Sequence, residues 1–142
     1  METESRIAIE SDADVVTARQ RARELASDLE LSSTDQTLLA TAISEVARNI
    51  TTYATRGEVR LRIVRNGDGR EGIEVVASDR GPGIPDIERA LQDGYTTGGG
   101  LGLGLPGARR LVDEFRIQST PSHGTTVTLV MWARNAGQSV RA

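Results

Sequence analysis

Gly94–Gly107 reads Gly-Tyr-Thr-Thr-Gly-Gly-Gly-Leu-Gly-Leu-Gly-Leu-Pro-Gly, and it holds seven of the chain's 15 glycines. Residues without a Cβ tolerate positive φ and let backbone N–H groups come close to a ligand. Pro106 favours the first turn of a helix, so we expect a loop that leads into a helix over Pro106–Glu114. Such a helix start binds anions, because its unpaired N–H groups and the helix dipole favour negative charge. The stretch predicts a phosphate site; the alternative is a flexible surface loop.

The composition excludes or disfavours several other kinds of site and partner. The chain has 142 residues, which suits one domain over 1–142, with Arg134–Ala142 expected to fray. It has no cysteine and one histidine, His123, which excludes thiol chemistry and disfavours a zinc site. The net charge of −3 argues against general nucleic-acid binding. No apolar run approaches about 18 residues, so we expect no membrane span and a cytoplasmic protein.

The absence of lysine narrows the nucleotide-binding classes. All 17 basic residues are arginine. A Walker A loop and a protein kinase of the usual type both bind phosphate through a lysine, so both are excluded. Phosphate would therefore be held by backbone N–H groups, arginine or a metal ion.

The first elements are an edge strand and a helix. Arg6–Glu10 alternates weakly between polar and apolar residues, which favours a short edge strand. Ser11 and Asp12 are candidate N-caps for a helix over about Ala13–Leu29.

A second helix carries two polar residues of interest. Ser33 and Gln36 fit a capping box, and the apolar stripe that follows predicts a helix to about Tyr53. Glu45 and Asn49 are four residues apart, so they share one face of this helix. Such a pair is usually solvated; here it borders the apolar stripe, which favours a functional role.

The remaining segments predict two hairpins separated by loops. The expected strands are Glu58–Arg65 and Gly72–Ser78, then Arg116–Ser119 and Thr125–Trp132. A rigid loop with two glycines and two prolines follows Asp79, and Asp86–Gln92 is expected to form a short helix. His123 lies in the second hairpin turn and is expected to be solvated. The element order predicts an α/β (α+β) two-layer sandwich, with helices on one face of a mixed, largely antiparallel sheet.

One apparent motif is rejected. Gly102–Gly107 fits the dinucleotide pattern G-x-G-x-x-G. That pattern should follow a strand in a βαβ unit and precede an acidic residue by about 20 positions. Neither condition holds, so a Rossmann fold is not expected.

Four motifs in order identify a better candidate. They are Glu45-x-x-x-Asn49 on a helix, Asp79-x-Gly81-x-Gly83 at a strand end, Gly98–Gly104 before a helix, and Gly124-Thr125 in a hairpin. In this order they resemble the N, G1, G2 and Gly-Thr motifs of the GHKL ATPase and kinase superfamily, which has the Bergerat fold. The chain looks like the small anti-sigma-factor serine kinases. Within them, Thr34–Gln36, Ala42–Ile50 and Gly99–Phe115 resemble the RsbT-like switch serine/threonine kinases of the stressosome. The resemblance covers roughly Val15 to Trp132.

The resemblance implies roles for individual residues. Asn49 would hold Mg²⁺ on ATP, and Glu45 would act as general base toward a serine or threonine hydroxyl. Asp79 would accept from the adenine amine, with support from Thr125. Arg19 matches a basic position on the family's first helix that faces the partner protein. The other nucleotide-binding residues would be Gly81, Gly83 and Ile84 beside the base, and Gly98, Gly99, Gly100, Leu101, Gly102, Leu103 and Gly104 over the phosphates.

The resemblance also implies partners. The expected activity is ATP- and Mg²⁺-dependent phosphorylation of STAS-domain proteins, which would be an RsbS-like antagonist and an RsbR-like scaffold. The released kinase would then activate an RsbU-like PP2C phosphatase. One alternative is an anti-sigma factor that sequesters a sigma factor and phosphorylates an anti-anti-sigma STAS protein. Another is a binding module that uses ATP only as a structural ligand. The sequence leaves open whether the chain forms a weak homodimer.

Overall fold

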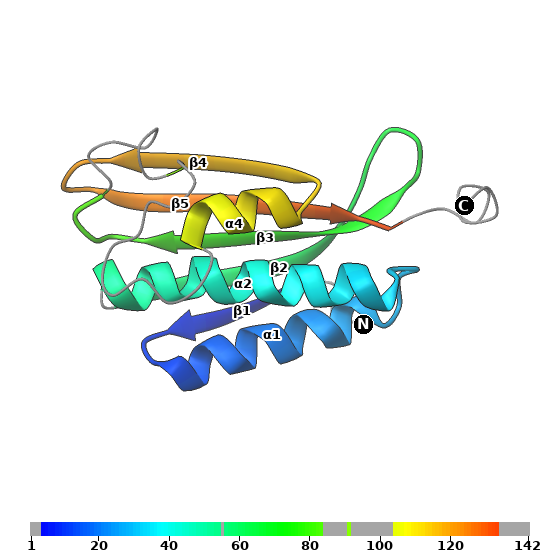
Figure 1. Ribbon diagram of the computed structural model, residues 1–142, viewed down its shortest axis with the longest axis horizontal. Helices are drawn as coiled ribbons and strands as arrows, with labels where there is room; N and C mark the ends of the chain where they lie inside the picture. Colours follow the sequence, from blue (N-terminus) through cyan, green and yellow to red (C-terminus); the bar gives the residue numbers. More distant parts are fainter. Residues whose placement is uncertain (1–3, 55, 84–90, 92–103, 134–142) are drawn as a thin grey trace.

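A computed structural model of the chain describes residues 4–54, 56–83, 91 and 104–133 (Figure 1). No helix in these ranges is long and apolar enough to cross a membrane. The described elements, in chain order, are β1 (Glu4–Ile9), α1 (Asp12–Ala26), α2 (Ser33–Tyr53), β2 (Gly57–Arg65), β3 (Glu71–Asp79), α4 (Gly104–Leu111), β4 (Glu114–Thr120) and β5 (Gly124–Trp132).

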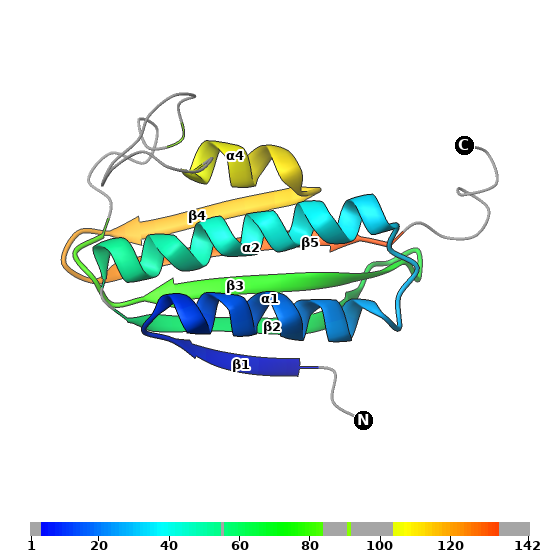
Figure 2. The same ribbon diagram turned by 60° about the horizontal axis from the view of Figure 1, so that its bottom comes forward.

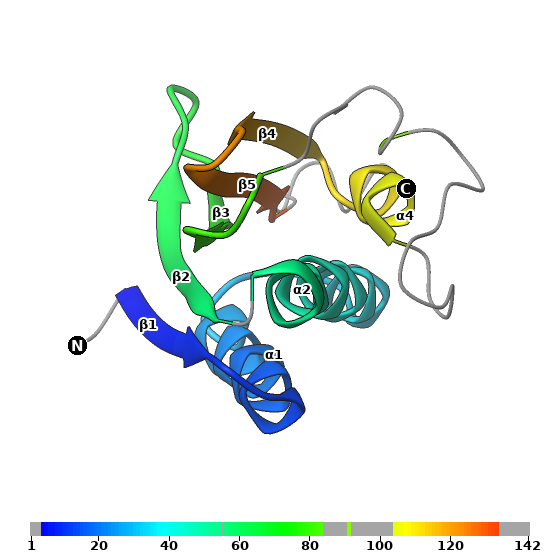
Figure 3. The same cartoon turned by 90° about the vertical axis from the view of Figure 1, so that its left-hand side faces the viewer.

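The strands form one five-stranded sheet in the order β1-β2-β3-β5-β4. Each neighbouring pair of these described strands is antiparallel. The sheet that they form is therefore fully antiparallel and not mixed. Figure 3 shows the three described helices on the same side of the sheet. Figure 2 shows α2 along the middle of this layer, with α1 on one side and α4 on the other. The predicted two-layer sandwich is confirmed.

The core lies between the helices and the sheet. Alternate residues of the central strands face inward, as the period of two requires. The apolar stripe predicted for α2 packs against them, because its residues recur at helical spacing. The most deeply buried large side chains, each less than 2% exposed, are Ile9, Leu39, Ile43, Val46, Ile50, Val59, Leu61, Ile73, Val75 and Leu129.

The first two elements are close to their predicted bounds. β1 is an edge strand, as expected, and it begins at Glu4 instead of Arg6. α1 ends at Ala26 and not at Leu29, because the backbone turns there: Leu29 N donates to Ala26 O over 2.9 Å, an i→i+3 turn bond. Leu29 is still buried, so it contributes to the core from outside the helix.

The start of α2 differs from the predicted capping box. The N-cap is Ser32, whose Oγ accepts from Asp35 N at 3.0 Å, and Ser33 is the first helical residue. Gln36 does not reach back to a cap N–H; its Nε2 donates to Leu31 O at 3.1 Å. The prediction of Ser33 as cap was therefore wrong by one residue. The backbone explains this, because Ser32 is extended, as an N-cap must be.

The helix predicted over Pro106–Glu114 was also misplaced. α4 covers Gly104–Leu111, and β4 begins three positions after it. Asp113 explains the early end. Its N donates to Val130 O at 3.0 Å, and its Oδ2 accepts from Trp132 N at 2.7 Å. These bonds draw the chain into the sheet instead of into another helical turn. Except for Leu91, the helix predicted over Asp86–Gln92 lies outside the described residues. The tail predicted to fray, Arg134–Ala142, lies outside them as well.

Candidate functional site

The fold brings the second helix and the end of the glycine stretch together. Glu45 and Asn49 lie one turn apart on α2. The Glu45 side chain is only 9% exposed, and its Oε1 accepts a hydrogen bond from Gly104 N at 2.9 Å. These two residues are 59 positions apart in the sequence. The acidic residue predicted to act on a hydroxyl therefore lies at the end of the loop predicted to bind phosphate.

This contact occupies the N-terminus of α4. Gly104 is the first residue of the helix and has a φ of +66°, which favours glycine. The first N–H groups of a helix lack intrahelical partners, and the positive end of the dipole attracts negative charge. The carboxylate of Glu45 satisfies one of these groups. This end of α4 therefore already binds an anionic oxygen, as a phosphate site must.

Asp79 is held firmly at the end of β3. Its Oδ1 accepts from Gly81 N at 2.8 Å and from Thr125 N at 3.3 Å. The carboxylate thus joins the loop after β3 to the start of β5. Two backbone donors on one oxygen fix the orientation of the group, which is what recognition of a ligand amine requires.

Glycine is needed around Asp79 because backbones pack closely there. A Cβ at Gly81 would lie 2.6 Å from Ala54 Cβ, and one at Gly83 would lie 2.6 Å from Thr120 O. Gly83 also has a φ of +82°. A Cβ at Gly124 would collide with the carbonyl of Asp79. The loop after β3 therefore fits against the end of α2 and against the β4–β5 turn only with glycine at these positions.

Thr125 lies in the same cluster, where it is 5% exposed. Its Oγ1 is 2.8 Å from Ser119 Oγ, so the two hydroxyls share a hydrogen bond. The sequence analysis did not select Ser119. Its position opposite Thr125 in the β4–β5 register was the available signal, once the hairpin was placed. His123 in the turn is exposed, as predicted.

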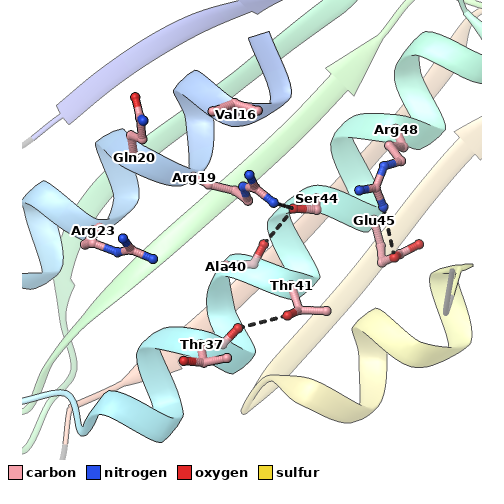
Figure 4. A pocket seen from close by; sticks show the side chains of 10 residues that line it. All are labelled: Val16, Arg19, Gln20, Arg23, Thr37, Ala40, Thr41, Ser44, Glu45 and Arg48. Carbon is pink, nitrogen blue, oxygen red and sulfur yellow. Dashed lines mark hydrogen bonds and ion pairs between the residues drawn. The ribbon is translucent and has the colours of Figure 1, made fainter. Parts of the chain in front are cut away.

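A hollow of about 510 Å³ lies between α1 and α2, with Glu45 on its wall (Figure 4). Arg19 also lines it and donates from Nη1 to Ser44 Oγ at 3.4 Å. Arg48 places its Nη1 3.3 Å from Glu45 Oε2. The sequence analysis missed Ser44 and Arg48, although Arg48 stands one helical turn after Glu45. The other lining residues are Val16, Gln20, Arg23, Thr37, Ala40 and Thr41.

The remaining predicted site residues cannot be placed. Ile84 and the residues Gly98, Gly99, Gly100, Leu101, Gly102 and Leu103 lie outside the described residues. The structure therefore joins Glu45 to Gly104, with Asn49 one turn from Glu45 on α2. It also joins Asp79 to Gly81 and Thr125, with Gly83 packed against the same turn.

The donor set near Asn49 fits a weakly held Mg²⁺. Within the described residues, no group of three or more His, Cys, Asp or Glu side chains could hold a metal ion. Mg²⁺ commonly takes one or two protein ligands and completes its shell with water and substrate phosphates. A single amide oxygen from Asn49 is compatible with that arrangement, and incompatible with a metal held by protein alone.

Comparison with known proteins decides the family. Residues 34–135 match the family described as histidine kinase-, DNA gyrase B-, and HSP90-like ATPase. The chain is 43% identical over 134 residues to the serine/threonine-protein kinase RsbT of Bacillus subtilis (strain 168), which covers 94% of this chain and 100% of that protein. The chain belongs to this family. Within it, the chain is an RsbT-like serine/threonine-protein kinase, and the family implies that it binds ATP.

Other proteins are similar to this chain in sequence or in fold. The anti-sigma F factor of Caldanaerobacter subterraneus subsp. tengcongensis is 31% identical over 99 residues, covering 66% of this chain and 68% of that protein. The solved RsbU and RsbW domains of Rv1364c from Mycobacterium tuberculosis superpose with a TM-score of 0.57 at 25% identity, over 93% of this chain and 34% of that one. The mycobacterial sensor histidine kinase MprB, at 22% identity and a TM-score of 0.57 over 92% of this chain and 98% of that one, shares the fold.

Proposed function

We propose that this kinase transfers the γ-phosphoryl group of ATP, with Mg²⁺, to a serine or threonine hydroxyl of a STAS-domain protein. The observation that carries the proposal is the bond from Gly104 N to Glu45 Oε1. It places a carboxylate able to take a proton at the end of the glycine stretch. A general base and a phosphate site must lie together for phosphoryl transfer to a hydroxyl.

The step follows from these groups. Glu45 accepts the proton of the acceptor hydroxyl, whose oxygen forms a bond to the γ-phosphorus. The bond between the γ-phosphorus and the β–γ bridging oxygen breaks, and its electron pair leaves with ADP. The products are ADP, a phosphoserine or phosphothreonine, and a proton on Glu45 that returns to solvent.

The phosphates would be held by the glycine stretch and by Mg²⁺. Backbone N–H groups of residues 98–103 would stabilise the charge of the phosphate oxygens, in place of the lysine that this chain lacks, because the Gly104 N–H already donates to Glu45. Asn49 would hold Mg²⁺, which neutralises phosphate charge when bound. This role fits its position one turn from Glu45 on α2.

Adenine would be recognised by the second group of residues. Asp79 would accept from the exocyclic amine, and Thr125 would support it. This assignment is supported by the fixed orientation of the Asp79 carboxylate, whose Oδ1 accepts hydrogen bonds from Gly81 N and Thr125 N. Gly81 and Gly83, with Ile84 after them, would let the base lie against the backbone.

The partners are proposed from the likeness to RsbT. They would be RsbS-like and RsbR-like STAS proteins of a stressosome, and release from them would let the kinase activate an RsbU-like PP2C phosphatase. Arg19, on the wall of the hollow that also contains Glu45, would contact the partner. We propose that the protein acts in the cytoplasm and that residues 1–142 form a single domain. The alternative, an anti-sigma factor kinase, is supported by the 31% identity to an anti-sigma F factor.

Phosphoryl transfer from labelled ATP to purified STAS-domain proteins tests the proposal. We expect Mg²⁺-dependent labelling of a serine or threonine in one of them. Glu45→Gln should abolish labelling while nucleotide binding survives, and Asn49→Ala should remove the Mg²⁺-dependent part of nucleotide binding. A pull-down with sigma factors and STAS proteins separates the two candidate functions.

The outcomes are distinct. Retained transfer in Glu45→Gln would refute the base assignment. Binding of a sigma factor together with labelling of a STAS protein would favour the anti-sigma alternative. ATP binding without transfer to any STAS protein would refute the proposed activity and leave the nucleotide site.

A further inference from the structure

Both carboxylate oxygens of Glu45 are engaged by different elements. Oε1 accepts from Gly104 N at 2.9 Å, and Oε2 lies 3.3 Å from Arg48 Nη1. Gly104 belongs to α4, whereas Arg48 follows Glu45 by one turn on α2. A glutamate side chain has several rotatable bonds, so one contact leaves it free to pivot. Two contacts in different directions define the position of its carboxylate.

The two contacts also face different surroundings. Gly104 lies at the helix end where phosphate is proposed to bind. Arg48 lines the hollow between α1 and α2, together with Glu45 and Arg19, and Figure 4 shows its guanidinium turned toward the Glu45 carboxylate. Oε2 is therefore the oxygen contacted by a residue that lines the hollow, whereas Oε1 is bound by α4. An acceptor hydroxyl that entered through the hollow would meet this oxygen first.

Arg48 is well suited to orient Glu45 without closing the hollow. Its side chain is 49% exposed, while the Glu45 side chain is 9% exposed. Because the arginine partner is half exposed, solvent screens the attraction and limits what the pair contributes to stability. A carboxylate oxygen can accept more than one hydrogen bond, so Oε2 can accept from Arg48 and from a hydroxyl at the same time.

We propose that Arg48 is a positioning residue for phosphoryl transfer: it holds Oε2 of Glu45 on the side of the hollow, where the acceptor hydroxyl arrives. This inference rests on the proposed function, in which Glu45 takes the proton of that hydroxyl. Arg48 acts through Glu45 and contacts neither the phosphates nor the nucleotide base.

The test compares Arg48→Gln with Arg48→Lys and Arg21→Gln, using full-length protein, ATP, Mg²⁺ and the STAS protein that the wild type phosphorylates. Arg21 is a matched control, because its Nε lies 3.3 Å from Glu24 Oε1 in another i,i+3 pair, and its side chain is also 49% exposed. It does not line the hollow. The measured quantities are kcat, the KM for ATP and for the acceptor, the Kd for ATP and the melting temperature.

Arg48→Gln should lower kcat about tenfold, because misplacement of a catalytic group costs more than the ion pair itself. Both KM values, the Kd for ATP and the melting temperature should stay near the wild-type values. Arg48→Lys should restore most of kcat, since an ammonium can still bond to Oε2. Arg21→Gln should match the wild type.

Four results would overturn the proposal. The first is an unchanged kcat in Arg48→Gln while Glu45→Gln is inactive, which would leave the proposed function intact. The second is a raised KM for the acceptor with kcat unchanged, which would make Arg48 a docking residue. The third is an equal loss in Arg21→Gln, which would point to a general effect of charge. The fourth is full transfer in Glu45→Gln, which would refute the base assignment and the Arg48 proposal together.

Discussion

Replacing Asp79 with asparagine should separate nucleotide recognition from folding. The side chain keeps its shape, and its oxygen can still accept from Gly81 N and Thr125 N. The amide, however, replaces the second carboxylate oxygen with an NH₂ donor, which would face the donor amine of adenine. The variant should therefore fold and lose affinity for ATP.

The magnitudes follow from the two hydrogen bonds. The bond from Gly81 N is short at 2.8 Å, and the bond from Thr125 N is long at 3.3 Å. Charge-assisted bonds are about twice as strong as neutral ones, so loss of the charge should cost roughly 1 kcal/mol of unfolding free energy. In a chain of this size that lowers the melting temperature by about 2–4 °C. An unpaired donor against adenine costs at least about 2 kcal/mol, which raises the Kd for ATP about thirtyfold.

Asp113→Asn is the matched control. Asp113 Oδ2 accepts from Trp132 N at 2.7 Å, so this aspartate also binds a backbone N–H of β5, at the opposite end of the strand from Thr125. It should lose similar stability and bind ATP normally. Isothermal titration calorimetry and thermal unfolding measure both quantities. An Asp79→Asn protein that binds ATP as the wild type does would refute the assignment of Asp79 to adenine.

Three further changes test the fold and the site. Ser32→Ala should lower the unfolding free energy in urea by about 1 kcal/mol through loss of the α2 cap; no change would mean that the cap does not act. Ile43→Ala should cost about 2–5 kcal/mol in the same assay, because the side chain is 0% exposed, whereas Val16→Ala at a 39% exposed position should be nearly neutral. Gly83→Ala should weaken ATP binding at least tenfold and lower stability by about 2 kcal/mol, since its φ is +82° and a Cβ would press on the backbone. Gly67→Ala, where a Cβ meets nothing within 4 Å, should leave ATP binding unchanged, and equal losses in both would contradict this reasoning.

The architecture and the family could both be predicted from the amino-acid sequence. Apolar periods of two and 3.6 residues identified the strands and α2, because burial on one face imposes those spacings on the sequence. The order of the four motifs indicated the GHKL family, which the comparisons confirmed. Element ends were less certain. The end of α4 depends on the bonds from Asp113 to β5, which are contacts between distant parts of the chain and leave no local pattern.

The contacts between site residues from distant segments depend on the tertiary packing and could not be predicted from the sequence. The sequence placed Glu45 and Asn49 on one helix face, but not the contact between Glu45 and Gly104, 59 residues later. It selected Gly83 and Thr125 by motif, but not the close packing of the β4–β5 turn against the loop after β3, which explains the need for glycine there. Arg48 and Ser119 had local signals that the sequence analysis missed: the helical spacing of Arg48 to Glu45, and the hairpin register of Ser119 opposite Thr125. These spacings do not show that the other oxygen of Glu45 is held by Gly104 of α4, because that contact depends on how distant parts of the chain pack together.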